Sequence, residues 1–155
     1  MTAHHGSFDR HTQELRHFVT FRLARLQSKL NAQGIRKLKL NSDLALTEWR
    51  IISIAAHSDE TTWSSIAQET ELDKGQLSRA VKTLAERGLL VSRVNSDDHR
   101  QNLLKLTEAG RAQYDKILPV MQKRQSDLTS GFSKQDMDTL MALLDRLERA
   151  ADATS

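Results

Sequence analysis

Helix-breaking residues are scarce in this chain, which has one proline, Pro119, and six glycines among 155 residues. Proline removes a backbone donor and glycine costs conformational entropy inside a helix, so their scarcity favours long helices. Two short runs rich in leucine and valine, at residues 89–94 and 103–106, have the length and composition of strands. We therefore expect a mainly α protein with a small β-ribbon.

The bulk composition is that of an ordinary folded domain rather than a disordered chain, with 38% hydrophobic and 28% charged residues. The length fits a single domain over residues 1–155. No apolar run is long enough for a membrane helix, and the start MTAHHGSFDR lacks an apolar secretory core, so we expect a cytoplasmic protein without a membrane partner. The absence of cysteine excludes disulfides and Cys-ligated metals.

Apolar spacing and capping residues predict the helices and their ends. The first runs from about residue 8 to residue 30 after an N-cap at Ser7, and residues 36–39 form a turn or fraying end. The later helices are expected at 48–57 after Thr47, at 63–69 after Thr62, at 74–87 between Asp73 and Gly88, from the cap Thr107 to about residue 130 with a kink at Pro119, and after Ser133. Helix, turn and helix followed by a ribbon is the order of a winged helix-turn-helix.

The helix after Asp73 has two chemically different faces. Ala80, Val81 and Leu84 fall within about 60° of Leu77 at 100° per residue, and the four residues make an apolar face. The remaining face and its flanks offer donors and small residues that suit base edges and phosphates, namely Lys74, Gly75, Gln76, Ser78, Arg79 and Lys82. For this helix alone, a solvated polar face is the plainer interpretation; the short helix before it and the ribbon after it favour DNA recognition.

The tip between the two predicted strands, NSDDHRQ, is unusually charged for a connecting loop. Arg100 on a protruding loop could enter a narrow minor groove, where the negative potential is strongest, and Asp98 could hold its guanidinium in a fixed orientation. The alternative is a turn held by Asx-type bonds, with a surface salt bridge worth about 0–1 kcal/mol.

Several motifs resemble those of the MarR family of transcriptional regulators. They are Asp98-His99-Arg100 followed by LLKLTEAG at 103–110, LTEWRII at 46–52, Ile66-Ala67, Leu72-Asp73, LSR at 77–79, Leu84, and GLLVSR at 88–93. The resemblance covers roughly residues 8–150. It departs from the family pattern at the tip, where the family often carries two adjacent arginines and this chain has His99 before Arg100. Minor-groove contact would then rest on Arg100, with His99 contributing below about pH 6.5.

The resemblance implies a two-fold homodimer around a DNA-binding lobe at residues 44–106. Its dimerisation helices would be 8–39 and 107–150, with two recognition helices in successive major grooves of a pseudo-palindromic site. Candidate contacts are Leu15, Val19, Leu26, Met121, Leu128, Met137, Leu140, Leu144 and Leu147, and we expect about half of such residues to be ordinary core instead.

The family resemblance also implies a small aromatic or anionic effector bound between the dimer helices and the DNA-binding lobe. His17, Phe21, Trp49 and Arg93 are candidate pocket residues, although a tryptophan on an apolar helix face more often belongs to the core. No cofactor and no metal site are expected, because His5, His11 and His17 recur every six residues and scatter around a helix.

Two functional hypotheses follow from the sequence. The first is a homodimeric, sequence-specific DNA-binding regulator, a repressor relieved by a ligand. The second is a winged-helix protein-interaction module that does not bind DNA. An enzyme is not expected, because the chain has no Gly-rich phosphate loop, no Gly-x-Ser-x-Gly and no His-Glu-x-x-His motif.

Overall fold

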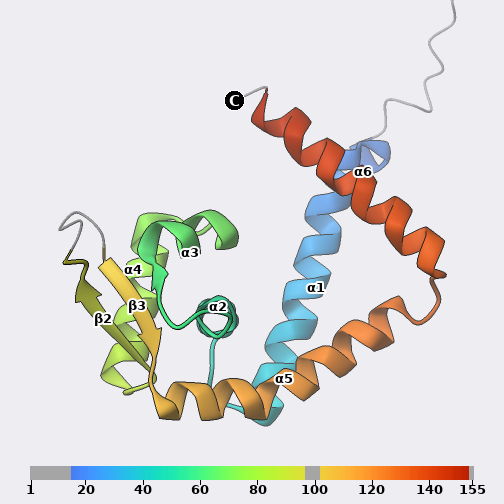
Figure 1. Ribbon diagram of the computed structural model, residues 1–155. Helices are drawn as coiled ribbons and strands as arrows, with labels where there is room; N and C mark the ends of the chain where they lie inside the picture. Colours follow the sequence, from blue (N-terminus) through green and yellow to red (C-terminus); the bar gives the residue numbers. More distant parts are fainter. Residues whose placement is uncertain (1–14, 97–101, 154–155) are drawn as a thin grey trace, which may run out of the picture. The chain divides into compact units, whose positions relative to one another are not determined.

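The computed structural model describes residues 15–96 and 102–153, which form two compact units, Met1–Leu118 and Pro119–Ser155 (Figure 1). The first unit contains a short 3-10 turn, Leu15–His17, and then α1 (Val19–Asn41), α2 (Leu46–Ala55), β1 (Thr61–Thr62), α3 (Trp63–Thr70), α4 (Lys74–Glu86), β2 (Leu90–Val94) and β3 (Asn102–Leu106). Helix α5 (Glu108–Thr129) begins in the first unit and continues through Pro119 into the second, which also contains α6 (Lys134–Asp152).

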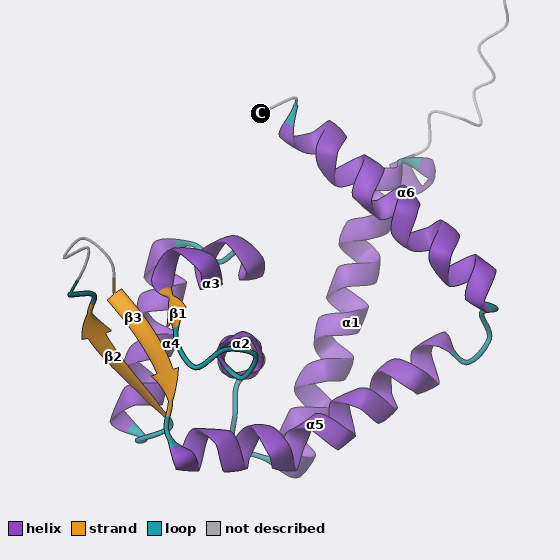
Figure 2. Cartoon of the chain, viewed as in Figure 1, coloured by secondary structure: helices purple, strands orange, loops and turns teal. Residues whose placement is uncertain are grey.

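Strands β2 and β3 form an antiparallel hairpin, and β1 adds to the free edge of β3, so the sheet order is β1-β3-β2 (Figure 2). Helices α2, α3 and α4 pack with this sheet around one core. The side chains at its centre are fully buried: Ile51, Ile52, Ile66, Leu77, Leu84, Leu90 and Leu104. The expected mainly α architecture with a winged helix-turn-helix is therefore confirmed.

Four of the predicted helix caps are present, among them Thr107, whose hydroxyl accepts the Gly110 backbone N–H at 3.0 Å. The side chains of Thr62, Asp73 and Ser133 accept hydrogen bonds from the backbone N–H groups of Ser65, Gln76 and Asp136, at 3.1, 2.8 and 3.1 Å. Each bond satisfies a donor that the first turn of a helix leaves unpaired. At the other end of α4, Gly88 adopts φ +68°, the left-handed conformation that glycine accepts without strain.

The first helix differs from its prediction at both ends. Its predicted cap, Ser7, and residues 8–14 lie outside the described residues, and the first regular α-helical residue described is Val19. At the other end, the predicted turn at residues 36–39 is wrong, because α1 continues to Asn41. Gly34 and Leu38, one helical turn apart, are both buried there. A glycine marking the buried face weakened the apolar pattern that the prediction relied on.

Helix α2 begins earlier than predicted, and Thr47 is not its cap. Ala45 precedes the first helical residue, and its backbone N–H donates to the Glu48 carboxylate at 2.9 Å. This is the glutamate half of a capping box, formed here without a side-chain acceptor at the cap position. Thr47 lies inside the first turn.

Strand β1 was not predicted from the sequence. Two residues are too few to show alternation, and Thr61 and Thr62 instead resemble the approach to the α3 cap. Pairing with Leu104 and Leu103 on β3 creates the strand, so it depends on a contact between distant segments. Among the helices of the described ranges, none combines enough length with enough apolar character to cross a bilayer.

Candidate nucleic-acid interface

Helix α4 buries one face and exposes the other, as its residue spacing predicts. Leu77 and Leu84 are fully buried, Val81 is 4% exposed and Ala80 9%. The polar residues identified in the sequence all lie in the exposed class: Lys74, Gly75, Gln76, Ser78, Arg79 and Lys82. The helix therefore holds a row of donors on its outer side while its apolar side fixes it to the core.

The first turn of α4 combines a capping carboxylate with a glycine. The Asp73 carboxylate is bonded to the Gln76 N–H, so one of its oxygens is held by the helix end. A Cβ atom at position 75 would lie 3.2 Å from Asp73 Oδ1 and 3.4 Å from a guanidinium nitrogen of Arg79. Glycine therefore leaves space around the cap, and it also lets another molecule approach the backbone closely.

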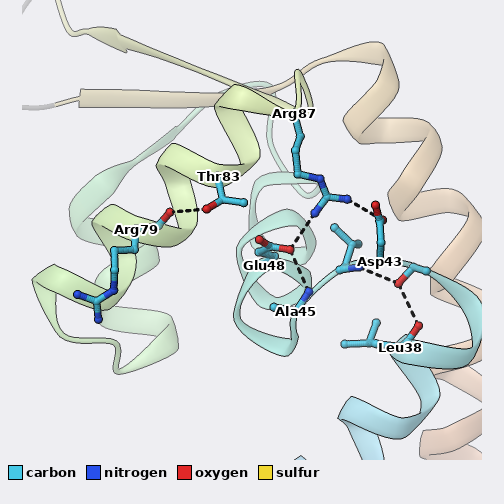
Figure 3. A network of polar contacts seen from close by, with 9 residues as sticks. Leu38, Asp43, Ala45, Glu48, Arg79, Thr83 and Arg87 are labelled. Carbon is cyan, nitrogen blue, oxygen red and sulfur yellow. Dashed lines mark hydrogen bonds and ion pairs between the residues drawn. The ribbon is translucent and has the colours of Figure 1, made fainter.

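Arg79 is the outward cation of this helix with the greatest capacity for directional bonds. Within the described residues, its guanidinium forms no hydrogen bond or ion pair, and Figure 3 shows the side chain pointing away from α2. Lys82 pairs with Glu86 one turn on, at 3.7 Å, with both side chains well exposed. An exposed ion pair of this kind contributes little free energy, so Lys82 can leave Glu86 and bind another anion.

The wing is held near the tip end of its strands by an arginine. Arg93 on β2 bonds both carboxylate oxygens of Glu60, with the shortest contact at 2.8 Å. Arg93 is in register with Leu103 on β3, and Glu60 directly precedes β1 on the far side of β3. The side chain therefore spans the middle strand. The predicted tip residues Asp98, His99 and Arg100 lie outside the described residues.

The four candidate effector residues are not brought together at one pocket. Trp49 is 7% exposed and stacks on Tyr114, with ring centroids 5.7 Å apart and planes within 13°. Its ring belongs to the core, which is the more common role of such a residue. Arg93 is bonded to Glu60 on the sheet, while His17 lies in the exposed turn before α1 and Phe21 stacks beneath Arg25 on α1.

A cavity of about 760 Å³ lies instead between the second half of α1, the α1–α2 corner and the turn between α3 and α4. Its wall includes Ile35, Lys39, Asp43, Arg50, Leu72 and Gln76, and none of the four predicted pocket residues. Gln76 belongs at once to this wall and to the exposed first turn of α4. No local pattern in the sequence indicates the cavity, because its lining comes from two stretches of the chain, 31–50 and 70–76.

The comparison with protein families decides what kind of winged helix this is. Residues 42–101, which contain the α1–α2 corner, the helix-turn-helix and the first wing strand, β2, match the model of the MarR family. This segment is therefore that of a MarR-family transcriptional regulator. The resemblance inferred from the sequence motifs is confirmed, and the family and the relatives named below are transcriptional regulators.

Relatives support the MarR assignment over more of the chain. A putative transcriptional regulatory protein for the hcr operon of Thauera aromatica is 24% identical over 134 residues, covering 86% of this chain and 81% of that protein. The crystal structure of a MarR/EmrR family transcriptional regulator from Acinetobacter sp. ADP1 is 28% identical, covers 95% of this chain and 99% of the other, and has a TM-score of 0.80.

A second solved structure shares the MarR fold at lower identity. The transcriptional regulator MOSR of M. tuberculosis, crystallised in complex with DNA, is 22% identical with a TM-score of 0.74, over 88% of this chain and 98% of that one. At this identity the likeness establishes the fold alone.

Sequence reasoning missed the contacts that hold α4 from behind. Arg87 bonds Asp43 and Glu48, and Thr107 donates to the carbonyl oxygen of Gly88 at 2.6 Å. Gly110 lets α5 pass close to the backbone of Leu89. Arg87-Gly88 at a helix end and a threonine before the next helix were visible in the sequence, but their partners were not.

Proposed function

We propose that this MarR-family chain acts as a homodimeric, sequence-specific DNA-binding repressor whose affinity for a pseudo-palindromic operator falls when a small ligand binds. The observation that carries the proposal is the division of α4: a fully packed apolar face, and an outer face whose donors are exposed near the helix N-terminus. That end of a recognition helix approaches base edges in a major groove.

Each outer residue has a distinct role in the proposed complex. Arg79 donates two bonds to guanine O6 and N7, and Gln76 pairs with adenine N6 and N7. Ser78 and the ammonium groups of Lys74 and Lys82 contact phosphates, which contribute affinity and register but little sequence information. Gly75 lets the backbone come close to the duplex.

The proposed wing contact uses the tip of the hairpin. Arg100 enters the minor groove beside the major groove that α4 occupies, and Asp98 orients its guanidinium. His99 adds charge when protonated. The Arg93–Glu60 pair supports this role, because it holds the tip end of β2 across the sheet and so limits movement of the strand that leads to the tip.

Exposed apolar side chains outside the winged helix support a homodimer. In the first unit, Leu15, Phe18, Val19 and Leu26 are 47–59% exposed on and before α1. In the second unit α6 contains no buried residue, and its apolar positions remain accessible: Leu140, Met141 and Leu143 are 40–53% exposed. Side chains of this kind are normally covered by a partner, and a two-fold axis would place two α4 helices about one turn of B-DNA, roughly 34 Å, apart.

The cavity beside α4 is the proposed effector site. It presents an apolar wall from Ile35 and Leu72 together with the cations Lys39 and Arg50. Of the two carboxylates in the lining, Asp43 is paired with Arg87, and Glu71 lies on the α3–α4 turn. This combination suits a small organic anion with an apolar body. Gln76 contributes to the cavity wall, so a ligand that contacts Gln76 there competes with the proposed contact between Gln76 and adenine. Ligand binding would therefore lower the affinity for the operator.

The decisive experiment is a mobility shift of the purified protein on the DNA upstream of its own gene, at two salt concentrations and beside a scrambled duplex of equal length. Specific binding that weakens steeply with salt supports the proposal. Equal binding to both duplexes, or none, contradicts it and favours a winged-helix protein-interaction module. Footprinting then reports whether protection covers two half-sites one helical turn apart.

The effector proposal has its own test. Isothermal titration with benzoate, an aromatic anion, is compared with benzamide, which has the same ring without the charge. Benzoate should bind and benzamide should not, and Lys39→Gln or Arg50→Gln should weaken benzoate binding. If benzoate releases the protein from the operator duplex and benzamide does not, the cavity is linked to regulation. Equal responses to the two compounds would count against a charge-selective site.

A further inference from the structure

Arg87, at the C-terminal end of α4, joins this helix to the corner between α1 and α2 (Figure 3). One terminal nitrogen donates to Asp43 Oδ1 at 2.6 Å, and the other donates to Glu48 Oε2 at 3.0 Å. The same Glu48 oxygen accepts the backbone N–H of Ala45 at 2.9 Å. The guanidinium therefore binds two carboxylates that lie about 40 residues before it in the chain. One of them, Glu48, also caps the N-terminal end of α2 through its bond to Ala45.

Burial makes the Glu48 half of this link the stronger. The Glu48 side chain is 10% exposed, and that of Arg87 27%, whereas that of Asp43 is 77% exposed. A buried carboxylate needs its partners, because removal of one leaves an uncompensated charge away from water. The planar guanidinium reaches two acceptors in a fixed geometry, which an ammonium group does not.

The corner that receives Arg87 is itself held in place. The backbone N–H of Ser42 donates to the carbonyl oxygen of Leu38 at 2.7 Å, and the backbone N–H of Leu44 donates to the Ser42 hydroxyl at 3.2 Å. Both Leu38 and Leu44 are buried. Asp43 and Ala45 therefore sit on a short connection with little freedom, so the corner can serve as a fixed support.

We infer that Arg87 is a positioning residue for DNA recognition: by bonding Glu48 and Asp43 it sets the tilt of α4 and so the place of Arg79, about two turns before it on the helix. This inference rests on the proposed function. Arg79 lies eight residues before Arg87, a distance of about 12 Å along the helix at 1.5 Å per residue. A tilt of about 5° about Arg87 therefore displaces Arg79 by about 1 Å. Bidentate base contacts tolerate only about half of that.

The test compares substitutions that remove the link with one that removes a similar bond elsewhere. Arg87→Gln breaks both contacts, and Asp43→Asn weakens the exposed contact while Glu48 stays paired. Arg111→Gln is the matched control, because Arg111 also joins two elements through its guanidinium, donating to the Ala56 carbonyl oxygen at 2.8 Å, without touching α4. Operator affinity is measured at a temperature where circular dichroism reports each variant fully folded.

Arg87→Gln should lower operator affinity about tenfold, the loss typical of one base contact, while its salt dependence stays that of the wild type because no phosphate contact is removed. Asp43→Asn should cause a smaller loss and Arg111→Gln none beyond about twofold. Arg87→Lys separates positioning from charge compensation, since it should recover thermal stability more completely than affinity. Wild-type affinity in Arg87→Gln, or an equal loss in Arg111→Gln, overturns the inference.

A readout without DNA keeps this inference distinct from the proposed function. Amide hydrogen exchange in Arg87→Gln should accelerate in the last turn of α4 and around Ala45, and remain unchanged in α3. If the wild-type protein has no sequence preference, the proposed function fails; faster exchange confined to α4 and the corner still supports the positioning role, and unchanged exchange overturns it.

Discussion

Gly110, in the first turn of α5, passes so close to the backbone of Leu89 that a Cβ atom at position 110 would overlap the Leu89 carbonyl oxygen. That oxygen also accepts the backbone N–H of Thr107 at 3.2 Å. The junction between the end of α4 and the start of α5 therefore requires glycine for its lack of a side chain. Gly110→Ala should destabilise the protein by about 1–3 kcal/mol, the usual cost of forcing atoms into a packed site.

Urea unfolding followed by circular dichroism measures this cost, and Gly131→Ala is its control. A Cβ atom at position 131 would meet nothing within 4 Å, so that variant should be neutral or slightly more stable. Equal midpoints for Gly110→Ala and the wild type would show that α5 can move away from Leu89 without loss.

Asp73 should stabilise α4 and weaken DNA binding at the same time. Asp73→Ala removes the bond to the Gln76 N–H and should cost about 1 kcal/mol of stability. Asp73→Asn keeps an acceptor at the cap but removes a negative charge that would face phosphates. Operator affinity of Asp73→Asn should therefore exceed that of the wild type, by a margin that shrinks as salt rises. Thermal melts and mobility shifts of both variants check the two halves separately, and a lower affinity for Asp73→Asn would contradict the electrostatic half.

Local periodicity accounts for the parts of the fold that sequence reasoning obtained. Leu77, Ala80, Val81 and Leu84 were assigned to one face by their spacing, and all four are buried. Thr62, Asp73 and Ser133 were assigned as caps because their partners lie three residues on. Each of these features is determined within a few residues of chain, which is the range that a sequence pattern encodes.

The failures involve partners that are far apart in the sequence. Glu48 and Arg87 are 39 residues apart, and Glu60 and Arg93 are 33 apart. Nothing in the sequence around Arg93 distinguishes a bond across a sheet from an effector contact, and nothing around Trp49 reveals the ring of Tyr114. The cavity beside Gln76 is likewise a product of packing between segments, so its residues could not be named in advance.

Arg79 and Lys82 should affect DNA binding in different ways. Arg79→Ala should cost about 1–3 kcal/mol on the operator and relax the preference at one base pair per half-site. Lys82→Ala should weaken binding to all sequences about equally and reduce the magnitude of the salt slope by about 1 per subunit. A panel of operator duplexes with single base changes, each measured at several salt concentrations, separates the two effects. Exchanged outcomes would mean that Lys82 reads bases and Arg79 contacts phosphate.

The start of α6 should contain an acid-sensitive cap. The Ser133 hydroxyl donates to Asp136 Oδ2 at 2.7 Å and the Ser133 backbone N–H donates to it at 2.9 Å, and these bonds hold the Asp136 pKa below its ordinary value of 3.8. Because the folded pKa is the lower one, the stabilisation is complete above pH 3.8 and is lost as the pH falls through the folded pKa.

NMR titration of the Asp136 side-chain carboxyl carbon measures this effect. Ser133→Ala removes the hydroxyl donor but keeps the backbone donor, so the Asp136 pKa should rise part of the way toward its ordinary value. Ser130→Ala is the control, because the Ser130 hydroxyl donates to the backbone carbonyl oxygen of Asp127 and not to the Asp136 carboxylate. An Asp136 pKa unchanged by Ser133→Ala would assign the lowering to the helix end instead.

The exposed apolar face of α6 should control the oligomeric state. Leu140 and Met141 are 40% and 53% exposed, and a homodimer would cover them. Replacing both with glutamate places charge in the proposed interface, where desolvation is costly, so the double variant should sediment as a monomer while the wild type sediments as a dimer. Gln135→Glu, on a different side of α6, should leave the dimer intact.

Because one subunit contacts one half-site, the monomeric variant should also lose cooperative protection of the operator and retain weak binding to a single half-site. A dimer that survives both glutamates would place the interface on other residues.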